Sequence, residues 1–231
     1  MLYIGDMWQY LQKEFNDLCK EFNITNCEFF FGKKETLLAT YIEIYKKHLT
    51  PTEALQRAQY ELFGYGFMSS VYLYFVDKKT KKVNKADIKY YVILLEDNIY
   101  RLYYDLKKYH VKYTDDELKE FLKICLRHEI GHIIDFQTSI KKAKDVDAWS
   151  KKRCELGWKE LEDYNLYLET LYEKFYKKNS KEKAEIRYLD SKKYNSMTSE
   201  VMANKLSHVD INKLNELCAK FLMIGNEEDI E

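Results

Sequence analysis

The sequence predicts a mostly helical α+β fold with a small β-sheet. Its 231 residues are 46% hydrophobic and 33% charged, which is a globular composition. Only one proline and seven glycines occur, which favours long helices and few irregular loops. Most of the chain carries apolar residues at helical spacing, but two short runs, 70–76 and 88–96, are rich in β-branched and aromatic residues, as strands are.

The first part of the chain, residues 1–66, is predicted to be a helical N-terminal subdomain. Apolar spacing predicts three helices there, at 6–22, 34–48 and 51–63. The third helix begins at Pro51, because proline is favoured at the first helical position. Gly64 and Gly66 then break the helical pattern. We therefore place the domain boundary here, with residues 67–231 as the second domain.

The second part of the chain is predicted to begin with a β-hairpin. A lysine-rich segment connects the two strand-like runs. Further helices are predicted at 98–110, 115–138, 145–178, 181–189, 199–207 and 210–223. The range 145–178 could hold one helix or two joined ones. Thr114 and Glu117 form a capping box at the start of the helix at 115–138.

Charge and cysteine content exclude several classes of protein. The 38 basic residues balance the 38 acidic ones, so we expect no nucleic-acid partner that depends on a positive field. The basic run at 78–82 is interpreted as a solvated turn. None of the five cysteines forms a C-x-x-C pair, and no signal peptide or apolar span is visible. We expect reduced thiols, a cytoplasmic location and no membrane association.

Residues 128–132 read His-Glu-Ile-Gly-His, which matches the pattern H-E-x-x-H. On a helix, positions i and i+4 lie on one face, so His128 and His132 can bind the same ion. This face is otherwise apolar, where an unpaired Glu129 would be costly. We therefore predict a zinc ion bound by both histidines, with Glu129 as general base towards zinc-bound water. Such a site needs a third protein ligand and an open fourth position.

Glu200 is the preferred third ligand. It lies in the segment Thr-Ser-Glu-Val-Met-Ala-Asn-Lys-Leu, where a helix cap precedes it and the small Ala203 allows another helix to pack closely. The alternative is that Glu200 is only a first-turn acid favoured by the helix dipole. Glu155 and Glu160 are weaker candidates. The other histidines, His48, His110 and His208, have no informative context.

The segments HEIGHIID and SEVMANKL together resemble the gluzincin pattern of zincin metallopeptidases, in which a glutamate on a later helix completes the site. The resemblance covers about 128–207. Lethal-factor-like zincins and the related Pro-Pro endopeptidases share Asp135, Glu200 and Ala203, and a tyrosine before the glutamate. Here that tyrosine is Tyr194, six residues ahead where the family has seven.

ImmA/IrrE-type peptidases share other features of the two segments. Their patterns H-E-x-G-H and E-x-x-A-N match Gly131 and Asn204. This chain lacks the small residue, leucines and proline with which that family usually continues. The ImmA-like helix also allows an antirepressor-type peptidase that cleaves or merely binds a regulator.

The resemblance implies a zincin-like catalytic domain that hydrolyses a protein or peptide substrate. In that family pattern Tyr194 would stabilise the oxyanion and Asp135 would orient a zinc-bound imidazole. An edge strand, either 70–76 or 88–96, would bind the substrate by strand addition. Cys125 is interpreted as a small core residue. The alternative is a non-catalytic structural or regulatory-binding protein that kept the fold, which Glu129 disfavours.

Overall fold

The computed structural model describes residues 3–47, 49–62, 67–77, 79–80, 82–84, 87–173 and 180–222. The helices are α1 (Ile4–Glu21), α2 (Lys34–Tyr45), α3 (Pro51–Leu62), α4 (Glu96–Lys108), α5 (Asp115–Lys142), α6 (Val146–Glu173), α7 (Ser180–Tyr194), α8 (Thr198–Leu206) and α9 (Ile211–Phe221). The strands are β1 (Cys27–Gly32), β2 (Ser69–Leu73) and β3 (Lys89–Leu95). The prediction of a mostly helical α+β fold with a small sheet is confirmed.

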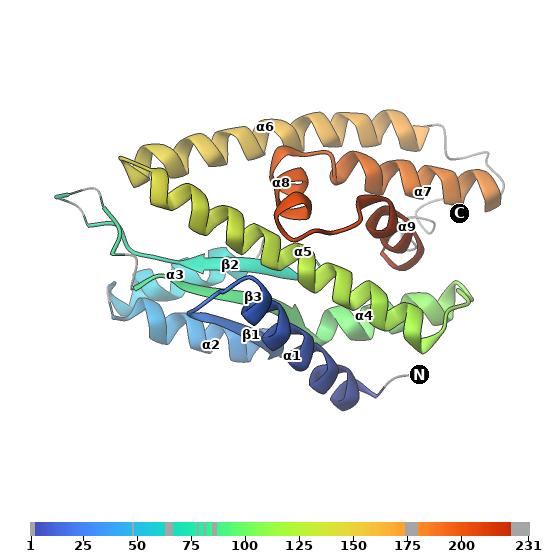
Figure 1. The fold of residues 1–231 in the computed structure, drawn as a ribbon, viewed down its shortest axis with the longest axis horizontal. Coiled ribbons are helices and arrows are strands. Elements are labelled where there is room, and N and C mark those ends of the chain that lie inside the picture. Colours follow the sequence, from blue (N-terminus) through green and yellow to red (C-terminus); the bar gives the residue numbers. More distant parts are fainter. Residues whose placement is uncertain are drawn as a thin grey trace.

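The three strands form one mixed sheet in the order β1-β3-β2 (Figure 1). β2 pairs with β3 antiparallel, with Ser69 opposite Ile93, which confirms the predicted hairpin. β1 pairs with the other side of β3 in parallel, with Cys27 opposite Tyr90. β3 is therefore the central strand, and every residue after Lys89 in it is buried.

β1 corrects the expectation that residues 1–66 are entirely helical. The segment Cys-Glu-Phe-Phe-Phe-Gly alternates its side chains between the two faces of the sheet, as a strand does. Phe29 and Phe31 pack into one hydrophobic core, and Phe30 packs into the other. A strand from the first expected domain thus completes the sheet of the second.

Helices cover both faces of the sheet. Tyr90, Val92 and Leu94 face a core that includes residues of α1, α4 and α5. The alternate residues Tyr91 and Ile93 face a second core, built with α2 and α3. The C-terminal helices α6 to α9 lie on the far side of α5 from the sheet (Figure 1). α5 is therefore covered from two sides.

The helix that carries the H-E-x-x-H motif begins where the sequence predicts. Thr114 Oγ1 accepts a hydrogen bond from the backbone N–H of Glu117 at 3.1 Å, and the Glu117 carboxylate accepts from the Thr114 N–H at 2.8 Å. α6 is a single helix, which decides between the two alternatives for 145–173. α7 extends five residues beyond its expected end at 189 and finishes at Tyr194.

Some expectations fall on residues outside the described ranges. They concern His48, Lys78, Lys81, the boundary at Gly64–Gly66 and the chain at 174–178. Within the described residues, no helix is both long enough and apolar enough to cross a membrane.

Candidate metal centre

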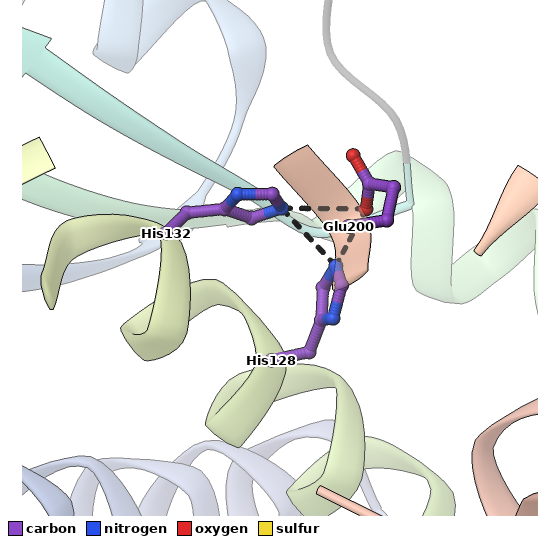
Figure 2. A group of neighbouring side chains, drawn as sticks. All are labelled: His128, His132 and Glu200. Carbon is purple, nitrogen blue, oxygen red and sulfur yellow. Dashed lines mark hydrogen bonds and ion pairs between the residues drawn. The ribbon is translucent and has the colours of Figure 1, made fainter. Parts of the chain in front are cut away.

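The site depends on an unusually close approach of two helices. A Cβ atom at Gly131 would lie 2.1 Å from the carbonyl oxygen of Ala203 and 2.8 Å from Ser207 Oγ. Only glycine leaves room for this approach of α8 to α5. Glu200, one helical turn before Ala203, is thereby held opposite the motif histidines (Figure 2).

Three potential ligand atoms meet where α5 and α8 cross. Glu200 Oε2 lies 2.9 Å from His128 Nε2 and 3.4 Å from His132 Nε2, and the two Nε2 atoms lie 3.1 Å apart (Figure 2). One ligand atom from each residue lies within 4.8 Å of the others. His128 and Glu200 are buried, and His132 is nearly so. This group could hold a metal ion.

The donor chemistry of the site fits a cation. Asn204 Oδ1 lies 2.7 Å from His128 Nδ1. An amide oxygen only accepts hydrogen bonds, so Nδ1 carries the proton and Nε2 of the neutral ring presents a lone pair. This lone pair points at Glu200 Oε2 and at His132 Nε2, which also presents a lone pair when it binds metal. Converging lone pairs repel unless a positive charge lies between them, and a metal ion meets this requirement.

In the metal-free protein a proton supplies that positive charge. Burial alone would lower the pKa of His128, but the hydrogen bond to Glu200, the negative charges of Glu129 and Glu200, and the bond to Asn204 together raise it to about 9. Burial opposes ionisation of Glu200, yet hydrogen bonds from His128 and His132 bring the pKa of this carboxyl well below its usual range. The site therefore stabilises a cation strongly.

Glu129 lies beside the three ligands but outside their group. Its side chain is buried, and this burial raises its pKa, although the neighbouring His132 and His128 oppose the rise. The Ser70 hydroxyl on β2 donates a hydrogen bond to the carboxylate. A carboxylate in this position can accept a proton near a metal-bound water.

A cleft of about 1110 Å³ opens onto the site. Its walls come from β2, α5, α6, α7 and α8, and include Glu129, His128, His132 and Glu200. Within the described residues β2 is an edge strand of the sheet, because β3 alone pairs with it. The cleft therefore joins the candidate metal centre to an unpaired strand edge.

Tyr194 is brought into this cleft at the end of α7. The residue as a whole is 39% exposed, and its ring packs edge-on against Tyr164 with 5.6 Å between ring centres. Burial of the hydroxyl, followed by the negative charges of Glu200 and Glu129, raises the pKa of Tyr194. The hydroxyl therefore stays protonated and can donate a hydrogen bond in the cleft.

Asp135 lies one turn beyond His132 and contacts other groups. Its carboxylate accepts from Arg153 Nη2 at 2.5 Å and from Ser139 Oγ at 3.3 Å. Among the described residues, neither motif histidine is a hydrogen-bond partner of Asp135. The expected role of Asp135 in orienting an imidazole thus has no hydrogen bond to support it, whereas Asn204 holds His128 directly.

The weaker ligand candidates lie outside the group. Glu155 is exposed and lies 3.9 Å from Lys151. Both carboxylate oxygens of Glu160 lie 3.1 Å from the backbone nitrogen of Thr198, the first residue of α8. Glu160 therefore caps this helix from α6, while the expected local cap is absent, since Met197 occupies the cap position. The other described histidines, His110 and His208, do not join the group.

Asn204 is the polar residue of the site that the sequence alone left without a role. It lies four residues after Glu200, so both side chains lie on one face of α8. This spacing could have indicated its position, but its partner lies 76 residues away in the sequence.

Comparison of the chain with protein-family models, curated proteins and solved structures found no match, so function has to be inferred from the site itself.

Proposed function

We propose that the protein is a zinc-dependent peptidase. The observation that carries this proposal is the convergence of His128, His132 and Glu200 on one point in an open cleft, with the buried Glu129 beside them. Two imidazoles and one carboxylate are ligands that zinc prefers in catalytic sites. A bound zinc ion would acidify a water molecule and polarise a carbonyl group.

Glu129 supplies the proton chemistry in this proposal. Glu129 is adjacent to the ligand His128 in the sequence, and it lines the cleft. It would accept the proton of the attacking water and pass it to the departing amine. A purely structural zinc site needs no such group, so Glu129 favours an enzyme over a non-catalytic protein.

β2 is the strand that would bind the substrate. Of the two strands considered from the sequence, β3 pairs on both sides, whereas β2 lines the cleft and pairs on one side within the described part of the chain. An extended peptide can pair with such an edge through main-chain hydrogen bonds. Tyr194, which also lines the cleft, would donate a hydrogen bond to the oxyanion that forms when water attacks.

Zinc content and peptide hydrolysis test this proposal together. Purified wild type should hold close to one zinc per chain, and His128→Ala should lose it. Glu129→Gln should keep its zinc and fold but lose cleavage of a diverse peptide library by about 10³-fold, because its amide cannot accept a proton. Tyr194→Phe should lose about 10²-fold. A zinc-loaded wild type that cleaves no peptide would instead support a non-catalytic role.

A further inference from the structure

Two arginine side chains line the cleft besides the residues of the candidate metal centre. Apart from Glu129 and the three residues of the metal centre, the charged side chains among its described lining residues are Arg57 and Arg153. Arg57 comes from α3 and Arg153 from α6. Apart from Glu129 and Glu200, the described residues that line the cleft include no acidic side chain. Arg153 pairs with Asp135, so a carboxylate ligand would be recognised through the N–H donors that this ion pair leaves over rather than through a net positive charge.

Arg153 is held in a defined position. Its Nη2 donates to Asp135 at 2.5 Å, and its guanidinium carbon lies 5.7 Å from the centre of the Trp149 ring. A guanidinium has five N–H donors, and of these, within the described residues, Asp135 accepts a hydrogen bond from Nη2 alone. The arginine side chain remains 33% exposed. Further N–H donors are thus available to a ligand, and the two protein contacts orient them in advance.

Aromatic rings line the cleft together with Arg153, and three of them pack on one another. Tyr72 stacks on Phe136 with 4.1 Å between ring centres, and Trp149 meets Phe136 edge-on at 5.3 Å. Such rings exclude water and strengthen a hydrogen bond between charged groups beside them.

The position of Arg153 along the cleft follows from the helix geometry. Its partner Asp135 is three residues after His132, which is about 4.5 Å further along α5. An extended peptide advances about 3.4 Å per residue, so Arg153 lies within about three residues of a bond held at the metal centre.

The direction of β2 indicates whether Arg153 would lie on the N-terminal or the C-terminal side of the scissile bond. β2 runs from Ser70, beside Glu129, to Tyr72, beside Phe136. A peptide that pairs with β2 in the more stable antiparallel direction has its N-terminal part beside Tyr72 and Arg153.

We propose that Arg153 selects substrates with an acidic side chain shortly before the cleaved bond. The inference rests on the proposed peptidase function, because it takes the scissile bond to lie at the metal centre. The carboxylate would accept hydrogen bonds from the guanidinium donors that Asp135 leaves available. The C-terminal carboxylate of the peptide cannot be this group. The N-terminal part of the peptide lies beside Arg153, and its C-terminus lies beyond the metal centre.

Cleavage of a proteome-derived peptide library by the zinc-loaded wild type tests the inference first. Aligned cut sites should be enriched in Glu and Asp at one of the three positions before the cut. In a matched peptide pair made from a cleaved sequence, Glu at this position should give about tenfold higher kcat/KM than Gln, as expected for a charge-assisted hydrogen bond. Equal cleavage of the Glu, Gln and Lys peptides would overturn the inference while leaving the peptidase function intact.

Variants separate a binding role of Arg153 from a structural one. In Arg153→Gln the Glu to Gln ratio of kcat/KM should fall to about one, whereas a purely structural role would lower cleavage of both peptides equally. The double variant Arg153→Gln, Asp135→Asn removes both charges, so no unpaired carboxylate is left at 135, and it should show the same loss of selectivity. Lys123→Gln, which removes an ion pair with Glu14 outside the cleft lining, is the control and should keep the wild-type ratio.

Binding measurements keep the inference testable even without cleavage. Fluorescein-labelled peptide pools enriched in Glu, Gln or Lys are titrated with zinc-loaded Glu129→Gln, and anisotropy is recorded. The Glu pool should bind about tenfold more tightly than the Gln pool, and Arg153→Gln should abolish the difference. Tighter binding of the Glu pool without hydrolysis by wild type would support Arg153 as an anion site and overturn the peptidase function. Equal binding of all three pools would overturn the inference.

Discussion

At the scale of single residues, the candidate site depends on which atom of His128 carries its proton. The hydrogen bond from Nδ1 to Asn204 Oδ1 fixes this tautomer and turns the Nε2 lone pair towards Glu200. Partners of this kind orient metal ligands and raise their basicity. Asn204 therefore orients a ligand of the candidate metal centre without belonging to the ligand group itself.

Replacement of Asn204 should weaken the metal centre without removing a ligand. In Asn204→Ala, zinc affinity should fall about 10- to 100-fold, because His128 loses the bond that orients it. Asn204→Asp should keep the affinity, since a carboxylate accepts the same bond and the Asn204 Nδ2, which is buried without a partner among the described residues, is removed. Competition with a chromophoric chelator measures both values.

The control for this comparison is Asn215→Ala, another buried asparagine whose partners are Ser191 and Asn195. It should lower stability but leave zinc affinity within about threefold of wild type. Equal zinc affinity in wild type and Asn204→Ala would contradict the role of Asn204.

Zinc binding should strengthen as pH rises, because the metal competes with the proton on His128. The folded pKa of this group is about 9, above its ordinary value of 6.5. Below pH 9 the proton must leave before zinc binds, so the dissociation constant should fall about tenfold per pH unit up to this value. Calorimetry in buffers of different ionisation enthalpy should also detect proton release. A dissociation constant that is flat between pH 6.5 and 9 would contradict this assignment.

The raised pKa of His128 also determines how the stability of the metal-free protein changes with pH. Since the folded pKa of His128 is raised, its protonated form stabilises the fold fully below pH 6.5, and this contribution is lost as pH rises through about 9. Chemical denaturation of the zinc-free protein across this range checks the direction.

At the scale of elements, the contact between α5 and α8 determines whether the ligands meet. Gly131 lies directly against the backbone of Ala203, and no flexible side chain separates the two helices there. The glycine in H-E-x-x-H is therefore required by packing rather than by its own chemistry.

Gly131→Ala should push the two helices apart. The added methyl group would overlap the Ala203 carbonyl, which should cost about 1–3 kcal/mol of unfolding free energy and move Glu200 away from the histidines. Urea denaturation and zinc titration measure the two effects. Gly157→Ala in α6 is the matched control, since no atom lies within 4 Å of its added Cβ. It should stabilise the protein by about 1 kcal/mol, because alanine favours a helix over glycine. Equal effects of the two substitutions would contradict the packing argument.

The elements also show what the sequence could and could not predict. The start of α5 was predictable because its capping box is local, with Thr114 and Glu117 three residues apart. β1 was not, because Cys27–Gly32 is short and becomes a strand only through pairing with β3, about 60 positions later in the chain. The cap of α8 was missed for the same reason, since Glu160 comes from another helix. Contacts between distant segments leave little trace in local patterns.

At the scale of the whole molecule, the sheet and the metal centre differ in how they are held. β3 contributes to both hydrophobic cores and is buried along its length. In α8 the buried residues are Glu200, Ala203 and Asn204, of which two are polar members of the site. None of the three belongs to either large core. The attachment of α8 to α5 therefore depends on the polar site, together with the close packing at Gly131 and the hydrogen bond from Arg127 to the Ser207 carbonyl.

Removal of zinc should consequently loosen the C-terminal part of the fold before the sheet. With metal, the folded state should gain about 4 kcal/mol at a thousandfold excess of free zinc over its dissociation constant. After chelation, hydrogen exchange should become faster in α8, because the His128, His132 and Glu200 side chains lose their shared cation. The hydrogen bonds of a protonated His128, the packing at Gly131 and the bond from Arg127 to Ser207 then hold this helix. Exchange in β3 should stay slow, since apolar burial on both faces holds this strand. Mass spectrometry of peptides from zinc-loaded and chelated protein measures both regions. Glu129→Gln should respond to chelation as wild type does, because Glu129 is not a ligand. Uniform acceleration in α8 and β3 would show that the protein unfolds as one unit when zinc is removed, and the separate attachment of α8 would then be wrong.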